Sequence, residues 1–346
     1  MTVDWTTLAT TTRILFTVPL RPLQGARFQP TGFPSLGPAV YETQEGTRLL
    51  VESTQSMANR LEATCWDFSK NEPIEVLRGI SHVTVRRPDK SFLTDSMLEA
   101  HRLNSPYILE NRDKTAQDFL AELKKKLGTL EKGPIDRALL ARTLLEYDVG
   151  SLIHGVFLAK SDLAGGRLRV TRALSAFIDA SGVRVAPAGG VKNDHVNPEG
   201  DTAKGFGNVP FSRDEFTAER IDLFVNLDLA QIRGYGLGEK VERMLVLLAL
   251  HRVRKLLDGD LRLRTACDLE VVDREIVAER PRGFVLPALR ALEDALREAI
   301  QSCKADMHHR TLVFADELKA AKPKKSATKE PTTQQSEPGD DAEDDT

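Results

Sequence analysis

Cysteine is scarce in this 346-residue sequence, and the shortage excludes two classes of protein. The three cysteines, Cys65, Cys267 and Cys303, lie far apart, and no C-x-x-C pair occurs. Such spacing predicts neither a disulfide framework nor a zinc site. We therefore expect a protein of the reducing cytoplasm that holds no structural metal.

Long apolar runs are also missing. The most apolar stretch, MLVLLAL at residues 244–250, is far too short to cross a bilayer. The first residues, MTVDWTTLATTTR, carry an early acid and no apolar run of signal-peptide length. We therefore expect no membrane partner.

The sequence also lacks an excess of positive charge. The formal net charge is -3 and the pI is about 6.2, whereas a generic nucleic-acid binder is basic. The segment from Lys319 onward holds five lysines and seven acidic residues, so the rest of the chain is close to neutral. RNA binding would have to rest on a local basic surface that acidic residues elsewhere balance. Complementary faces of stacked copies would supply such a balance.

The composition that is present describes a globular protein with a substantial core. Hydrophobic residues make up 41% and charged residues 29% of the chain. The length fits one elaborated domain or two closely packed ones, and we expect a single domain over residues 1–318. Residues 319–346 are polar and of low complexity and contain no aromatic residue, so we expect a disordered charged tail.

Hydrophobic periodicity divides the body of the chain into strand and helix segments. Strands are predicted within residues 14–20, 48–52, 76–86, 152–159, 167–178, 220–232 and 261–272, and helices within residues 53–66, 239–257 and 288–303. Residues 96–147 have helical periodicity and read as a helical insertion. The order fits an α+β fold with a ferredoxin-like antiparallel sheet. We expect the amphipathic helix over residues 288–303 to pack on that sheet.

Residues 50–62, LVESTQSMANRLE, read as a strand that runs into a helix with small polar side chains in its first turns. Unpaired N–H groups and the helix dipole make such a helix start attractive to phosphate. The predicted RNA contacts here are Ser53, Gln55, Ser56, Asn59 and Arg60. In the alternative interpretation, Ser53 or Thr54 only caps the helix.

Residues 21–41 form a long loop that is rich in glycine and proline. Loops of this length are uncommon unless they bind something or are disordered, and the aromatic residues here argue against disorder. Arginines and glutamines interleave with those aromatics, which suits single-stranded nucleic acid. We predict RNA contacts at Arg27 and Gln29. The alternative is a loop pinned to the core by its own aromatic side chains.

A glycine-rich turn at residues 234–238, GYGLG, opens a predicted helix. Backbone N–H groups can approach phosphate closely there, because glycines have no side chain. The predicted contacts are Arg233, Gly234, Tyr235 and Gly236. The turn lacks the Lys-[Ser/Thr] of a P-loop, so no nucleotide cofactor is predicted. The alternative is an ordinary tight turn.

Cations also surround the predicted hairpin tip AGG at residues 164–166. Lys160 and Arg167 are predicted RNA contacts, and alternation places Arg167 and Arg169 on one face of their strand. A solvated sheet face explains the same residues. Elsewhere the sequence predicts no catalytic residue, because histidines and carboxylates follow no ligand or acid–base spacing.

Three strings carry a family resemblance: LQGARFQPTGFPSLGPAVY, LLVESTQSMANRLE and VNLDLAQIRGYGLG. They resemble the backbone subunit of the type I-U (also called I-G) CRISPR Cascade surveillance complex, a member of the RAMP superfamily. The likeness extends over residues 13–272. It implies a modified RRM-like ferredoxin fold with a protruding thumb, for which residues 186–210 and the block 96–147 are competing candidates.

This resemblance implies a non-catalytic protein of antiviral defence that coats CRISPR RNA. Its partners would be further copies of itself, other Cascade subunits and, through the guide, a target nucleic acid. Contacts would go mainly to phosphates and sugars, because a scaffold must accept any guide sequence. We expect charge reversal at Arg27 and Arg60 together to lower RNA retention without lowering the melting temperature.

Two other functions stay open at this point. A RAMP-type endoribonuclease that processes precursor CRISPR RNA would need His154, His82 or His101 as general acid and base. A protein-only assembly scaffold would hold no RNA, which the near-neutral charge permits.

Overall fold

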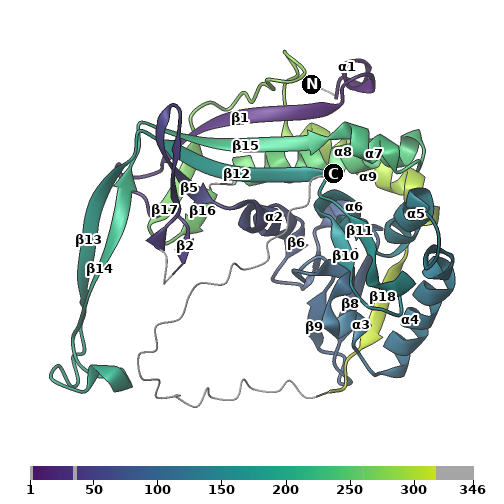
Figure 1. Cartoon of the computed structure of the whole chain (residues 1–346), viewed down its shortest axis with the longest axis horizontal. Helices are drawn as coiled ribbons and strands as arrows, with labels where there is room; N and C mark the ends of the chain where they lie inside the picture. The colour runs from purple at the N-terminus through teal and green to yellow at the C-terminus, as the bar shows by residue number, and fades with distance from the viewer. Residues whose placement is uncertain (1–2, 34–36, 260, 317–346) are drawn as a thin grey trace. The chain divides into compact units, whose positions relative to one another are not determined.

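The computed structural model describes residues 3–33, 37–259 and 261–316, and its largest element is a seven-stranded antiparallel sheet (Figure 1). In spatial order its strands are β16 (Leu261–Arg264), β17 (Cys267–Val271), β1 (Arg13–Pro22), β15 (Arg220–Asp228), β12 (Leu174–Ser181), β5 (Gly46–Glu52) and β4 (Val40–Thr43). The described residues up to Ala315 form one compact unit. The predicted mixed fold with an antiparallel sheet is therefore confirmed. The predicted tail, residues 319–346, lies outside the described residues.

The strand β1 shows how the sequence builds the core. Its residues alternate between buried and partly exposed positions, the period-2 pattern of a sheet with one covered face. Phe16 is buried and lies opposite the buried Val225 of β15. Neighbouring strands therefore place their apolar residues on the same face of the sheet.

Three helices build the layer beside this sheet. The helix α2 (Thr54–Ala63) packs against β12, and α8 (Glu239–Asp258) packs against α2 and α9 (Leu289–Cys303). The helix α8 is buried on nearly all sides from Met244 to Val253, as expected for a helix between two layers. The predicted stripe of α9 is buried, but it packs on α8 and the turn η1 (Glu75–Leu77). The expectation that α9 packs on the sheet was wrong, because its main contacts are with these two elements and not with a strand.

Between α2 and β12 the chain forms a group of elements that we call the inserted lobe, residues 66–170. Its strands are β6 (Trp66–Asp67), β7 (Glu72–Pro73), β8 (His82–Arg86), β9 (Phe92–Asp95), β10 (Val156–Leu158) and β11 (Leu168–Val170). Its helices are α3 (Pro106–Leu109), α4 (Lys114–Leu127), α5 (Arg137–Tyr147) and α6 (Gly150–His154). The distant strand β18 (His309–Val313) pairs in parallel with β8. Helices α3, α4 and α5 lie in the range predicted to be a helical insertion.

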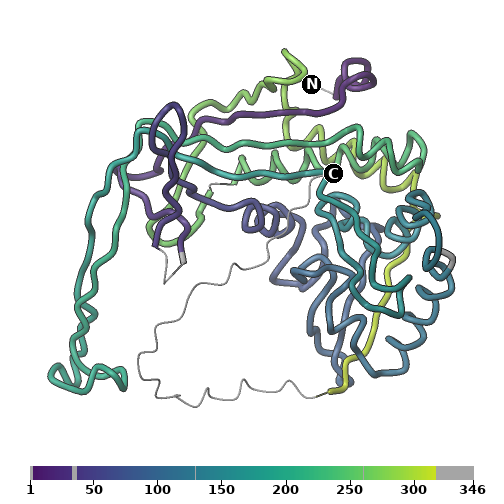
Figure 2. The backbone as a smooth tube through the Cα atoms, viewed as in Figure 1, coloured from purple at the N-terminus to yellow at the C-terminus, as the bar shows by residue number. Residues whose placement is uncertain are grey.

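A long hairpin lies between β12 and β15 in the sequence. It consists of β13 (Arg184–Lys192) and β14 (Val209–Thr217), which pair in antiparallel register along their whole length. No residue of β13 is buried. Figure 2 shows the hairpin running away from the seven-stranded sheet. It contains residues 186–210, one of the two candidates for the thumb.

The strand predicted within residues 220–232 ends earlier than expected, and the one predicted within residues 152–159 begins later. The strand β15 stops at Asp228, because its carboxylate accepts a hydrogen bond from the N–H of Gln231 (2.8 Å) and so caps α7 (Leu229–Gly234). The segment 152–159 contains the end of α6 and only the short strand β10. Every residue of α6 is buried, so its sequence has no alternation that could distinguish helix from strand.

Three further predictions change in detail. The segment 261–272 is a hairpin, β16 and β17, instead of one strand. The loop 21–41 contains the short strands β2 (Gly32–Phe33) and β3 (Gly37–Pro38) and begins β4. A short helix, α1 (Trp5–Ala9), precedes β1 and is capped by the side chain of Asp4. Within the described part of the chain, no helix is both long and apolar enough to cross a membrane.

Candidate nucleic-acid interface

A cleft of about 920 Å³ lies where the ends of β1 and β15 meet α5, β11 and α7. Its charged lining residues are Arg13, Arg137, Arg167, Arg169 and Asp228. Four guanidinium groups thus face a single carboxylate among the described residues that line it. The cleft is therefore a locally basic surface on a chain of near-neutral charge. We call it the arginine cleft.

The four arginines reach the cleft from three separate parts of the chain, because Arg167 directly precedes β11 and Arg169 lies in it. Arg13 begins β1 and pairs with Asp228 of β15, both in strand register and as an ion pair of 2.9 Å. Arg137 is the first residue of α5, directly after the helix cap Asp136. Arg169 is exposed at the centre of β11, whose neighbour Leu168 is buried. This alternation on β11 was predicted from the sequence.

The arginine charges in the cleft are only slightly neutralised. Arg167 donates to the carbonyl oxygens of Leu130 and Gly133 (2.9 Å to the latter), which hold its guanidinium without cancelling its charge. Arg137 and Arg169 have no acceptor among residues 3–33, 37–259 and 261–316. Only Arg13 has a carboxylate partner. The cleft is therefore set up to receive an anion.

The predicted helix start at Ser53 serves first as a cap. The hydroxyl oxygen of Ser53 accepts a hydrogen bond from the N–H of Ser56 (3.3 Å), as the alternative interpretation stated. Gln55 and Asn59 are exposed, and the amide of Gln55 donates to the side chain of Asn59 (3.1 Å). Their polar side chains thus remain at the surface.

This helix start is joined to the arginine cleft. Arg172 donates a hydrogen bond to the side-chain oxygen of Gln55. Its neighbour Thr171 lines the cleft and exchanges two hydrogen bonds with Gln231, of 3.0 and 2.7 Å. Gln55 is therefore connected to the cleft through Arg172 and Thr171.

The side chain of Arg60 is bound by other parts of the protein. Its guanidinium donates to the carbonyl oxygens of Arg262 (3.2 Å) and Leu263 (2.5 Å) and lies 3.4 Å from the carboxylate of Glu52. Glu52 is 2% exposed and also binds Arg264. We call these three charged residues the Glu52 clamp. Reversing the charge of Arg60 would break this clamp, so the expectation of an unchanged melting temperature is revised.

Arg27 and Gln29 lie at a different place. Arg27 lines a second pocket, of about 390 Å³, and its half-exposed side chain is 3.6 Å from Glu215. The carbonyl oxygen of Gln29 accepts from Arg264 (2.7 Å). Phe28 between them is buried and its backbone pairs with Phe216, so an aromatic does pin this loop. No described residue lines both this pocket and the arginine cleft.

Only part of the glycine-rich turn lines the arginine cleft. Gly234 and Tyr235 line the arginine cleft, but Tyr235 is buried and its hydroxyl donates to the carbonyl oxygen of Leu152 (2.8 Å). Burial raises the pKa of Tyr235 to about 12. The N–H of Gly236 bonds to the carbonyl oxygen of Arg233 (3.0 Å), so it does not point to a ligand. The backbone at Gly236 is left-handed (φ 65°), which favours glycine.

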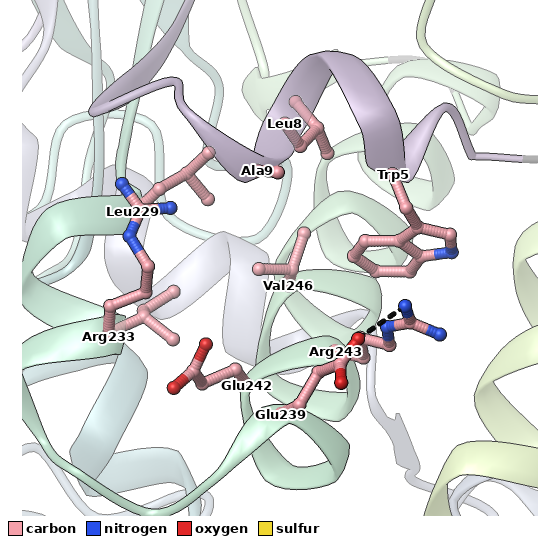
Figure 3. Close-up of a pocket in the computed structure, with 10 residues that line it drawn as sticks. Trp5, Leu8, Ala9, Leu229, Arg233, Glu239, Glu242, Arg243 and Val246 are labelled. Atoms are coloured by element: carbon pink, nitrogen blue, oxygen red, sulfur yellow. Dashed lines mark ion pairs between the residues drawn. The ribbon is translucent and has the colours of Figure 1, made fainter.

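Arg233 lines one side of a separate pocket of about 280 Å³ between α1, α7 and α8 (Figure 3). Its guanidinium donates to the carbonyl oxygen of Thr11 (2.6 Å). On the other side of this pocket Arg243 lies over the ring of Trp5, 5.3 Å from its centroid, and pairs with Glu239. These contacts fasten α1 to the helix layer. Lys160 also lies outside the arginine cleft and pairs with Glu110 (2.7 Å).

The histidines proposed for an RNA-cleaving alternative are not gathered in the cleft. His154 is buried, and burial together with nearby arginines lowers its pKa well below the usual range. His82 donates to the buried Asp95 (2.8 Å) on the far sheet of the inserted lobe, and His101 is exposed elsewhere. Among the residues that the structure describes, no three His, Cys, Asp or Glu side chains could hold a metal ion.

Residues 14–185 match the family model described as CRISPR-associated protein GSU0053. That segment contains Arg137, Arg167 and Arg169. The description names no subtype, and the match supports the resemblance to CRISPR-associated proteins that the sequence shows. None of the curated proteins matches the chain.

Two solved structures are similar over most of their length. The crystal structure of Csc2 from Thermofilum pendens is 11% identical, with 88% of this chain and 79% of that chain covered and a TM-score of 0.33. A chain of a CRISPR RNA-guided surveillance complex in a pre-nicking state is 13% identical, with 75% of each chain covered and a TM-score of 0.33.

Sequence reasoning missed Arg13 and Arg137 as members of the interface. Arg13 reads only as the first residue of a strand, and Arg137 as an exposed residue after a helix cap. No local pattern marks either one, because the cleft forms only when β1, α5 and β11 come together.

Proposed function

We propose that this chain is a non-catalytic, RNA-binding backbone subunit of a Cascade-type CRISPR surveillance complex. The arginine cleft carries the proposal, because it concentrates four cations from three distant segments in a chain whose net charge is negative. The family match over residues 14–185 supports the CRISPR association.

The chemistry of the cleft suits the backbone of a guide more than its bases. Guanidinium groups bind phosphate oxygens in a planar, bidentate manner. Such contacts carry no sequence information, which fits a scaffold that must accept any guide. The exposed amides of Gln55 and Asn59 extend the polar surface along α2.

The strand order supports the finer prediction of an RRM-like core of the RAMP type. The strands β17, β1, β15 and β12 are neighbours in that order. The helix α2 lies between β1 and β12 in the sequence, and α8 lies between β15 and β17. A ferredoxin-like β-α-β-β-α-β unit with its four strands in the order 4-1-3-2 has this arrangement. We propose that the chain is a backbone subunit of the type I-U (I-G) complex.

The hairpin of β13 and β14 is our candidate for the thumb that contacts an adjacent copy. With the loop that joins its strands, it exposes five large apolar side chains: Val185, Val191, Val196, Phe206 and Phe211. Exposed apolar groups on a projecting element favour contact with a partner. Other Cascade subunits and a target strand paired with the guide would be the further partners, in the cytoplasm.

The test is co-expression of the full chain with a CRISPR array, followed by purification and sequencing of the bound nucleic acid. We expect array-derived RNA in a particle much larger than one chain. The double variant Arg137→Glu/Arg169→Glu should lose most of this RNA. The matched control is Arg282→Glu/Arg290→Glu, which reverses two exposed arginines outside the cleft and should retain it.

Two results would replace this proposal with an alternative. Steady cleavage of a repeat hairpin by the purified protein would indicate the endoribonuclease. An ordered oligomer without nucleic acid would indicate the protein-only scaffold. Equal RNA loss in the cleft variant and in its control would show that the cleft is not the binding site.

A further inference from the structure

The face of the seven-stranded sheet that is turned away from the buried core carries two aromatic rings at its centre. Phe177 of β12 and Phe224 of β15 are direct partners in strand register. Their ring centroids are 5.0 Å apart and the rings are stacked at an interplanar angle of 23°. Both are only half-buried, although their sequence neighbours Ile178 and Val225 lie in the core. A pair of large apolar rings is thus partly exposed in the middle of a sheet.

Polar side chains lie beside this ring pair, together with the partly exposed Leu15 and Pro19 on the same sheet face. Thr17 of β1 lies in the same register row, and Asn226 and Ser175 form part of the next row. The side chains of Thr17 and Ser175 have no hydrogen-bond partner in the part of the chain that the structure describes. Aromatic rings framed by hydroxyl and amide groups suit nucleobases, which stack on rings and hydrogen-bond through their edges.

The ring pair leads directly to the arginine cleft. Arg13 and Asp228, which both line the cleft, lie opposite each other on the same sheet face. Asp228 is four residues from Phe224 along β15. Four residues along a strand span about 13 Å. The row on the other side holds Asp179 and Asp222, which bind Tyr41 (2.6 Å) and Arg220 (2.5 Å). Phosphates would therefore lie at the arginine end of this face and not at the aspartate end.

We propose that Phe177 and Phe224 form a stacking platform for bases of a single-stranded nucleic acid whose phosphates lie in the arginine cleft. The inference rests on the proposed function and adds the base contacts to it. Stacking accepts any base, so the platform is compatible with a guide of any sequence.

The test is fluorescence anisotropy of the full chain with two labelled probes, a 20-nucleotide uridine RNA and an abasic oligomer with the same number of phosphates. The variant Phe177→Leu/Phe224→Leu keeps apolar volume in the sheet and removes the ring faces. We expect it to bind the uridine RNA about tenfold more weakly and the abasic oligomer as well as the unchanged protein does. The control Phe68→Leu alters an exposed ring outside both the platform and the cleft and should change neither.

The outcomes separate the platform from the cleft. Equal affinity of the leucine variant and the unchanged protein for the uridine RNA would overturn the platform while the cleft stands. Weaker binding of the uridine RNA alone, with no effect of Arg137→Glu/Arg169→Glu on either probe, would support the platform and overturn the cleft. A protein that binds neither probe would overturn both. Thermal melting of each variant separates lost binding from lost folding.

Discussion

A buried ion pair between Glu62 of α2 and Arg102 of the inserted lobe joins these two parts of the protein. Arg102 and Glu62 are 5% and 6% exposed, and two hydrogen bonds of 2.8 and 2.7 Å connect them. Arg102 also donates to the carbonyl oxygen of Gly155 (3.2 Å). The guanidinium therefore satisfies acceptors on two elements that would otherwise be buried without partners.

Removing one member of this pair should be costly. We predict that Arg102→Ala lowers the free energy of unfolding by about 3–5 kcal/mol, because it leaves the Glu62 carboxylate buried and unpaired. Urea unfolding at neutral pH measures this. The double variant Glu62→Gln/Arg102→Met should recover much of the loss, since no charge is then buried alone. A single variant as stable as the unchanged protein would contradict the prediction.

The carboxyl group of Asp148 should make stability depend on pH. It is buried, accepts from Ser151 (2.7 Å) and from the N–H of Leu103 (3.2 Å), and its other oxygen has no described partner. Burial raises its pKa to about 6. The folded protein therefore holds this proton more tightly than the unfolded chain does, so this contribution is complete below pH 4 and is lost as the pH rises through 6.

The variant Asp148→Asn isolates this effect. Relative to that variant, the unchanged protein should lose about 3 kcal/mol of unfolding free energy between pH 4 and pH 8. Urea midpoints of both proteins across this range measure the difference, in which the titration of all other groups cancels. A constant difference would show that Asp148 keeps an ordinary pKa.

At the scale of elements, the Glu52 clamp ties three segments together. Arg60 of α2 and Arg264 at the end of β16 both bind the buried Glu52 at the end of β5. We predict that Arg60→Glu lowers the free energy of unfolding by about 2–3 kcal/mol, because it removes charge-assisted hydrogen bonds and adds a carboxylate beside Glu52. Arg282→Glu, at an exposed site without a described ion-pair partner, is the control and should leave thermal and urea unfolding unchanged.

The hairpin of β13 and β14 should be separable from the rest of the fold. We predict that replacing residues 187–214 with a short glycine-containing turn changes the free energy of unfolding by less than about 1 kcal/mol, because nearly all of the removed residues lie outside the core. The same variant should form smaller RNA particles, as size-exclusion chromatography with light scattering would show. Particles of full size would contradict the role as a thumb.

The sequence predicts those elements that have one buried face and one exposed face. Alternation in β1 and the stripe of α9 specify a strand and a helix because each element has one buried face. The segment of α6 fails for the opposite reason, since burial on all sides leaves no period. The end of β15 depends on a single cap, Asp228, which a strand pattern hides.

The candidate site was less predictable than the fold. Arg167 and Arg169 stand out in the sequence because alternation predicts that they share a strand face, whereas Arg13 and Arg137 carry no local signal. Arg60 was assigned to RNA because an arginine on an amphipathic helix reads as exposed. Its partners, Arg262 and Leu263, lie some two hundred residues away in the sequence, and only the folded chain brings them together.

At the scale of the whole molecule, salt should weaken RNA binding although the chain is acidic overall. Each phosphate contact made by a cation on a single strand contributes a slope of about -0.7 to the logarithm of affinity against that of salt concentration. We predict that removing Arg137 and Arg169 together makes this slope less steep by about 1.4. Anisotropy titrations between 50 and 200 mM salt measure it. The Arg282/Arg290 control should keep the original slope.

The parallel pairing of β18 with β8 has a consequence for the order in which the protein is made. The strand His82–Arg86 leaves the ribosome more than two hundred residues before His309–Val313, its partner on one edge. Until then that edge presents unpaired N–H and C=O groups, which attract other strands. The inserted lobe is therefore completed only when synthesis has passed Val313. A nascent chain halted earlier would present an open edge that chaperones and proteases recognise, so the fold itself distinguishes finished chains from unfinished ones.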